Sequence, residues 1–143
     1  MITRRFQMRL DCRYQGPDNT PSDLHVQTLD QGEWRDFQLG FATPGFLSFV
    51  YAILNCQHLY MRVNAAERGL QLAAATGSIQ LSAAEDWRIE ALEVHFDAEL
   101  AAGTPTQNDN DYIVDRMRHC PVSVNLKEPP RSRTTLNFTR LVA

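Results

Sequence analysis

The sequence predicts a single α+β domain, residues 1–143, in which one long helix lies between two groups of antiparallel strands. Apolar and polar residues alternate in residues 6–14 and again in residues 92–98, which is the period of a strand with one wet face. Between them, residues 46–54 are apolar except for Ser48, which is typical of a buried helix. The predicted order of elements is β-β-β-α-β-β-α-α-β, and no repeat or linker interrupts it.

The first forty residues predict a small antiparallel meander. A Gly-Pro-Asp-Asn sequence ends the first strand, and residues 24–29 and 34–41 follow as two short strands around an Asp-Gln-Gly turn. The side chains that share the apolar face of the first strand are Phe6, Met8, Leu10, Cys12 and Tyr14.

The long helix is predicted over residues 46–69. Because it has almost no polar face in its first half, it must be surrounded on most sides. Thr43 is the expected N-cap, with Pro44 at the first helical position, and Gly69 is placed to end the helix in a left-handed conformation.

After this helix, residues 70–75 and 78–81 read either as two strands around a turn at Thr76-Gly77 or as one bent strand. The strand at residues 92–98 follows and gives the clearest alternation in the chain.

A second helix is predicted after a loop at residues 101–107, capped by Asn108 or Asp109. It ends at Cys120-Pro121, because the residue before a proline is pushed out of the helical region. Residues 122–127 predict a short third helix, stopped by the Glu-Pro-Pro sequence that follows, and residues 134–142 predict a closing strand.

Composition limits the function classes. Fourteen basic and seventeen acidic residues give a net charge of −3 without a basic cluster, so nucleic acid is not an expected partner. The N-terminal MITRRFQMRL lacks the apolar stretch of a secretory signal, and the apolar part of the long helix is too short to cross a bilayer. We therefore expect a soluble cytoplasmic protein, in which three cysteines are thiols rather than a disulfide framework.

The three cysteines differ in what they predict. Cys12 shares the apolar face of the first strand, which favours simple core packing. Cys56 lies inside the apolar helix, where packing is again the commoner role for a cysteine taken alone. Cys120 precedes Pro121 at the expected start of a helix, where unpaired N–H groups lower a thiol pKa. A Cys-Pro pair at that position also serves as a plain helix boundary, and both interpretations stay open for Cys120.

Metal and cofactor sites are not expected. His58 and His119 lie near the thiols in sequence, but residues one or two apart on a helix point roughly 100° or 200° apart, so these pairs do not converge. A zinc site would instead show a Cys-x-x-Cys pair or histidines at i and i+4. The sequence also lacks the nucleophile elbow, the glycine-rich phosphate loop and the zincin motif.

One combination of motifs resembles a known family. The long apolar helix carries Cys56 and ends at Gly69, two strands follow, and the run His-Cys-Pro-Val-Ser stands at residues 119–123. This arrangement resembles the OsmC/Ohr family of osmotically induced and organic hydroperoxide resistance proteins. The resemblance implies the OsmC-like fold, with antiparallel sheets wrapped around a long central helix in an intertwined homodimer. It also implies a peroxidatic Cys56 and a resolving Cys120 at the subunit interface.

In that family an arginine from the N-terminal meander activates the peroxidatic thiol, and a glutamate near the start of the helix holds the arginine. Arg13 is the closest positional match to the arginine. The chain departs from the family at the glutamate, because no carboxylate lies between Asp36 and Glu67.

Two functional hypotheses follow. The first is a thiol peroxidase that reduces small organic hydroperoxides and is reset by an external dithiol reductant. The second is a divergent, non-catalytic protein of the same fold that binds a small apolar ligand or senses oxidants.

Overall fold

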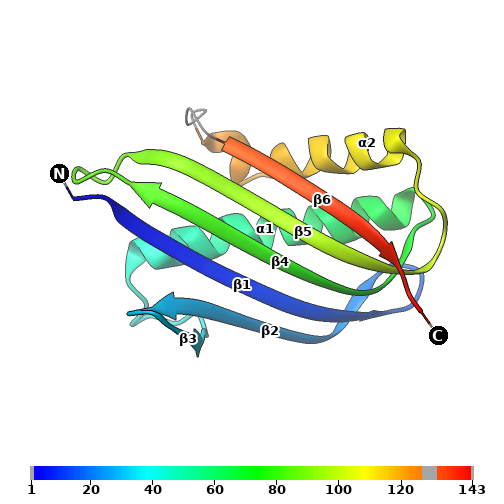
Figure 1. Ribbon diagram of the computed structural model, residues 1–143, viewed down its shortest axis with the longest axis horizontal. Coiled ribbons are helices and arrows are strands. Elements are labelled where there is room, and N and C mark those ends of the chain that lie inside the picture. The colour runs from blue at the N-terminus through cyan, green and yellow to red at the C-terminus, as the bar shows by residue number, and fades with distance from the viewer. Residues whose placement is uncertain (1, 127–131, 143) are drawn as a thin grey trace.

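In the computed structural model, which describes residues 2–126 and 132–142, six strands form one sheet in the order β3-β2-β1-β4-β5-β6. Both α-helices lie on one face of this sheet (Figure 1). The predicted order of elements is confirmed. The elements are β1 (Arg4–Gln15), β2 (Thr20–Asp30), β3 (Glu33–Asp36), α1 (Gly45–Glu67), β4 (Gln71–Ala83), β5 (Ile89–Ala102), α2 (Gln107–Arg118), the 3₁₀ helix η1 (Ser123–Asn125) and β6 (Ser132–Arg140).

The N-terminal meander forms as predicted, with β1 antiparallel to β2 on one side and to β4 on the other. Its inward face packs on α1, and its buried residues include Met8, Leu10, Cys12 and Tyr14. The third strand is shorter than expected, because β3 ends at Asp36 instead of continuing to residue 41.

Helix α1 runs along the sheet and buries the face that carries Val50, Ile53, Leu54 and Met61. Its end is as predicted, with Gly69 at a φ of 72°. Its start differs, because Pro44 is the N-cap and Thr43 is used elsewhere: the Thr43 hydroxyl accepts a hydrogen bond from the Gly40 N–H at 3.0 Å. Within residues 2–126 and 132–142, no helix is long and apolar enough to span a membrane.

Residues 70–81 adopt the second of the two predicted forms, since β4 is one continuous strand with irregular register near its start. Gly77 in its middle makes room for Phe96 of β5: a Cβ at this position would lie 2.3 Å from the Phe96 ring. The glycine is therefore required by the close approach of an aromatic ring, and no turn is present there.

The C-terminal part returns the chain to the sheet beside β5. Strand β6 pairs with β5 in parallel, not in the antiparallel manner expected, because α2 carries the chain back along the sheet before β6 begins. The cap of α2 is Thr106 rather than Asn108 or Asp109. Thr106 Oγ1 accepts from the Asp109 N–H at 3.1 Å, and the Asp109 carboxylate accepts from the Thr106 N–H at 2.9 Å, which forms a capping box.

The predicted third helix is a single 3₁₀ turn, η1. Lys127 and the predicted stop at residues 128–130 lie outside the described residues. Within one chain the sheet covers one side of α1, so the wrapping of sheets around both sides of the helix stays a prediction for a pair of chains.

Asn19, in the turn between β1 and β2, is fully buried and joins three segments. Its amide nitrogen donates to the carbonyl oxygens of Arg62 at 3.0 Å and Leu70 at 3.1 Å, and its oxygen accepts from the Leu72 N–H at 2.8 Å. We expect Asn19→Ala to lower the free energy of unfolding by roughly 2 to 3 kcal/mol, because two buried backbone groups and one partly buried backbone group lose their partner. Urea denaturation measures this change. The exposed Asn137→Ala is the control, and equal stabilities of the two variants would contradict the prediction.

Candidate functional site: a pair of thiols

Two cysteines that lie far apart in the sequence meet between α1 and η1. Cys56 projects from α1, and Cys120 stands between α2 and η1. The two side chains lie close enough for Cys120 to raise the pKa of the Cys56 thiol. All three cysteines of the chain are free thiols. Cys56 is partly exposed, whereas Cys120 is fully buried, so a reagent from solvent meets Cys56 first.

The turn at residues 120–123 brings backbone groups close to the two sulfurs. The Ser123 N–H donates to Cys120 Sγ at 3.4 Å, and the Val122 backbone lies near enough to Cys56 to lower the pKa of its thiol. Pro121 permits this geometry because it fixes its own φ and leaves α2 unable to continue. The Cys120 carbonyl then accepts from the Val124 N–H at 2.9 Å, which opens η1. Cys120 thus lies two residues ahead of Val122, the N-cap of η1, and the helix expected there is only a 3₁₀ turn.

Burial dominates the electrostatics of Cys56. Desolvation, assisted by the neighbouring Cys120 and opposed by the Val122 backbone, raises the pKa of the Cys56 thiol to about 11. Among the described residues, no cationic side chain contributes to this pKa. At neutral pH the Cys56 sulfur is therefore almost entirely in the thiol form.

Arg13, the predicted activating cation, lies on the other side of the sheet. It is exposed on β1 between the buried Cys12 and Tyr14, and α1 packs on the face that those two residues share. Within one chain Arg13 therefore does not reach Cys56. The reason is the alternation of the strand itself, which turns every second side chain away from the helix.

Gln57 connects the turn at residues 120–123 to the sheet. Its side chain is only 3% exposed. Its amide nitrogen donates to Ser123 Oγ at 3.1 Å, and its oxygen accepts from the Thr134 hydroxyl of β6 at 3.1 Å. Ser123 Oγ also lies 3.2 Å from Cys120 Sγ. The sequence carried no signal for this chain of hydrogen bonds, because its members come from three separate elements.

Comparison with known proteins identifies the fold. No protein-family model matches the sequence, and no curated protein matches it either. Among solved structures, the chain is similar to an OsmC-like hydroperoxide resistance protein from Jannaschia sp. CCS1, with 13% identity, 87% of each chain covered and a TM-score of 0.56. It is also similar to an OsmC-like protein from Mycoplasma pneumoniae, with 8% identity, 92% of this chain and 96% of the other covered, and a TM-score of 0.52.

The chain has the OsmC-like fold. The fold inferred from the helix with Cys56 and the run at residues 119–123 is thus confirmed across most of the length. The structural similarity establishes the fold of this OsmC-like chain, whereas identities of 8% and 13% leave the roles of its thiols to be argued from its own residues.

A second polar cluster of the OsmC-like domain lies deeper in the core. The Tyr14 hydroxyl and His58 Nε2 are 2.6 Å apart, and the His58 ring stacks on Phe96 with centroids 5.8 Å apart. Burial and, to a smaller extent, the positive charge of the nearby Arg62 lower the His58 pKa to about 4. Cys12 lies beside Tyr14 with a pKa raised by burial, as expected of a cysteine that packs in the core.

His58 is thus committed to Tyr14 and not to a thiol. Among the described residues, no group of three or more histidine, cysteine or acidic side chains could hold a metal ion.

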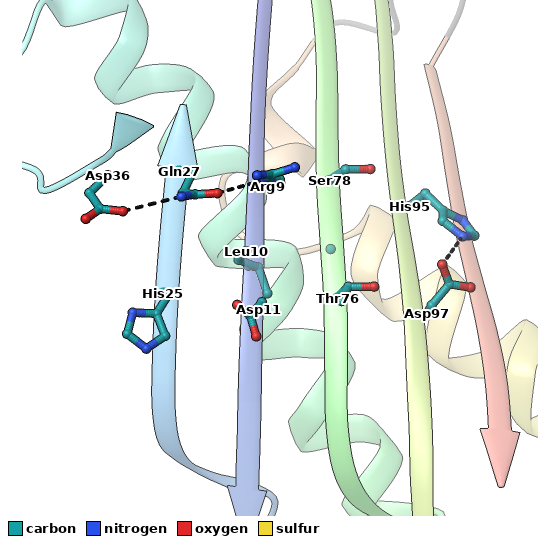
Figure 2. A pocket seen from close by; sticks show the side chains of 11 residues that line it. Arg9, Leu10, Asp11, His25, Gln27, Asp36, Thr76, Ser78, His95 and Asp97 are labelled. Carbon is teal, nitrogen blue, oxygen red and sulfur yellow. Dashed lines mark hydrogen bonds and ion pairs between the residues drawn. The ribbon is translucent and has the colours of Figure 1, made fainter. Parts of the chain in front are cut away.

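A cavity of about 560 Å³ lies on the outer face of the OsmC-like sheet, away from the helices (Figure 2). Arg9 Nε donates to Gln27 Oε1 at 2.8 Å across it, and His95 Nε2 pairs with Asp97 at 3.1 Å. The polar lining suits a polar ligand, so the hypothesis of an apolar ligand gains no support from this cavity. Its polar lining residues are Arg9, Asp11, His25, Gln27, Asp36, Thr76, Ser78, His95 and Asp97.

Proposed function

We propose that this OsmC-like protein is a thiol-dependent peroxidase that reduces small organic hydroperoxides through Cys56 and Cys120. The observation that carries the proposal is the proximity of a partly exposed thiol, Cys56, and a buried thiol, Cys120, which the fold brings together from positions 64 residues apart. The description of the structurally similar Jannaschia protein as a hydroperoxide resistance protein supports the same substrate class.

The exposure of the two thiols supports their assigned roles. The Cys56 thiolate attacks one oxygen of the hydroperoxide, the O–O bond breaks, and the alcohol leaves with a proton, so that Cys56 becomes a sulfenic acid. Cys120 then attacks this sulfur and expels water to give the Cys56–Cys120 disulfide. An external dithiol supplies the two electrons that restore both thiols by exchange. We expect this cycle in the cytoplasm, where such reductants are maintained.

The test is direct. Reduced protein is treated with cumene hydroperoxide, and free thiols and disulfides are measured by mass spectrometry for the parent, Cys56→Ser and Cys120→Ser. We expect a Cys56–Cys120 disulfide in the parent, no oxidation at Cys120 in Cys56→Ser, and an accumulating Cys56 sulfenic acid in Cys120→Ser. Cys12→Ser is the control that retains parental behaviour. A parent that keeps all its thiols at millimolar peroxide over an hour would refute the proposal.

A second candidate is a slow oxidant sensor of the same fold. The raised pKa of Cys56 favours it, because a thiol that stays protonated reacts too slowly for efficient turnover. The same measurement separates the two: a sensor forms the disulfide once and slowly, whereas a peroxidase cycles when a dithiol such as dithiothreitol is added.

The proposal includes a homodimer. Leu59 and Val63 of α1 are 40% and 41% exposed, and on a helix they lie on the same side as Cys56. Val124 of η1 and Phe41 ahead of α1 are exposed as well. An apolar surface next to the thiol pair favours a second copy of the chain, with the thiols near the interface.

We therefore expect Leu59→Glu combined with Val63→Glu to convert the dimer to a monomer, because two buried charges would face the partner helix. Sedimentation equilibrium measures the molar mass. Leu24→Glu, at a residue that is likewise 40% exposed but lies on β2, is the control. A parent that is monomeric at high micromolar concentration would contradict the prediction.

The role of Arg13 depends on the same assembly. If a second copy brings it to Cys56, Arg13→Gln slows peroxide oxidation of Cys56 at neutral pH about tenfold or more, whereas Arg9→Gln on the same strand face does not. Stopped-flow measurement of thiol loss compares the two variants. Equal rates would remove Arg13 from the site.

A further inference from the structure

The hydrogen bonds around Gln57 have a fixed direction. The Thr134 hydroxyl donates to Gln57 Oε1, which only accepts, so the amide nitrogen faces Ser123 and donates to its Oγ. A hydroxyl oxygen accepts two hydrogen bonds and donates one. With Gln57 on one acceptor position, the Ser123 hydroxyl keeps its own hydrogen for another partner.

That partner is the Cys120 sulfur, 3.2 Å away. In the reduced protein the Cys120 thiol donates to Ser123 Oγ. When Cys120 loses its proton, the Ser123 hydroxyl can rotate and donate to the sulfur, which already accepts from the Ser123 N–H at 3.4 Å. Two donors from one residue then stabilise the charge.

We propose that Gln57 is a positioning residue for the resolving step: it holds the Ser123 hydroxyl as a hydrogen-bond donor to the Cys120 thiolate. Ser123 contacts the reacting sulfur, and Gln57 acts through it. The inference rests on the proposed role of Cys120 as resolving thiol. It assigns a function to a buried amide that sits next to Cys56 in sequence but serves the other cysteine.

The burial of the hydrogen bonds that link Thr134, Gln57 and Ser123 supports this assignment. Gln57 and Thr134 are 3% and 9% exposed, so water does not compete for their hydrogen bonds. Cys56 from α1 is a titratable neighbour of Cys120. His119, next to Cys120 in sequence, is exposed and directed at Asp115 of α2.

The test avoids peroxide. Reduced protein is mixed with a dipyridyl disulfide, whose exchange with the partly exposed Cys56 forms a mixed disulfide and releases one thiopyridone. Cys120, having lost its proton, attacks the Cys56 sulfur, the Cys56–Cys120 disulfide forms, and a second thiopyridone leaves and takes up a proton. The rate of the second release measures the Cys120 step. A failure of the peroxidase proposal leaves this readout intact.

Gln57→Glu keeps the size of the side chain but replaces the donor with a carboxylate that accepts from Ser123. We expect the pH midpoint of the second release to rise by about one unit, and its rate at pH 7 to fall about threefold. The rate falls less than the thiolate population because a more basic thiolate is the better nucleophile. Thr134→Val, which lets the amide turn over, changes the rate in the same direction by less.

Two comparisons distinguish positioning from a general structural effect. In a Ser123→Ala background, Gln57→Glu is expected to lose most of its effect, because the group through which it acts is absent. Asn55→Asp adds the same charge at an exposed position on the other side of Cys56 and is expected to leave the second release unchanged. A parental pH profile in Gln57→Glu, or an undiminished effect in the Ser123→Ala background, would overturn the proposal.

Discussion

Raising the pH from 7 to 9 is expected to increase the rate at which an organic hydroperoxide oxidises Cys56 about a hundredfold. Burial raises the Cys56 pKa to about 11, so over this whole range the thiolate is a minor species whose population grows tenfold per pH unit. The thiolate is the form that attacks peroxide. Initial rates of thiol loss with cumene hydroperoxide, measured by stopped flow between pH 7 and pH 9, give the dependence.

The control for this prediction is Cys12→Ser, which removes a buried thiol that packs in the core and leaves the pH dependence unchanged. A rate that does not vary between pH 7 and pH 9 would contradict it. That result would mean that a cation absent from the single chain lowers the Cys56 pKa in the assembled protein, and the variants at Arg13 and Arg9 would then identify it.

The predictable parts of the fold are those in which the spacing of apolar residues along the chain indicates which side chains are buried. The alternation around Leu10 in β1 and Phe96 in β5 placed both strands, and the apolar run before Leu54 placed α1. Gly69 marked the end of that helix because glycine adopts a positive φ without strain.

The parts that were not predictable depend on competition between neighbours or on distant pairing. Three residues within four positions are good N-caps: Thr106, Asn108 and Asp109. Thr106 becomes the N-cap because its reciprocal hydrogen bonds with Asp109 form a capping box. The parallel pairing of β6 with β5 depends on the path of α2 across the fold, which no local pattern records.

The candidate site also has features that the sequence could predict and features that it could not. The proximity of Cys56 and Cys120 could be anticipated only through the resemblance, since nothing local to either residue points to the other. The placement of Arg13 could have been anticipated from the sequence, because the alternation that buries Cys12 and Tyr14 turns Arg13 outward. Gln57 gave no signal: a polar residue in an apolar helix shows that a partner is needed, but not which partner.

Lowering the pH from 7 to 4 is expected to cost about 3 kcal/mol of folding free energy through His58 alone. In the unfolded chain His58 titrates near the ordinary histidine pKa of 6.5, whereas burial and the nearby Arg62 lower its pKa to about 4 in the folded state. Above pH 6.5 both states are neutral and the contribution is complete. As the pH falls below 6.5, the unfolded chain binds a proton that the folded chain does not, and stability is lost until about pH 4.

The groups that face His58 explain why the folded protein resists protonation. Tyr14 from β1 holds its Nε2, Phe96 from β5 covers the ring, and Arg62 from α1 adds a positive charge. Urea denaturation at a series of pH values measures the loss. His58→Gln, which can still accept a hydrogen bond from Tyr14 but does not titrate, is expected to remove most of the slope between pH 6.5 and pH 4. The exposed His25→Gln is expected to retain it, and a His58→Gln variant with the parental slope would assign the acid sensitivity to other groups.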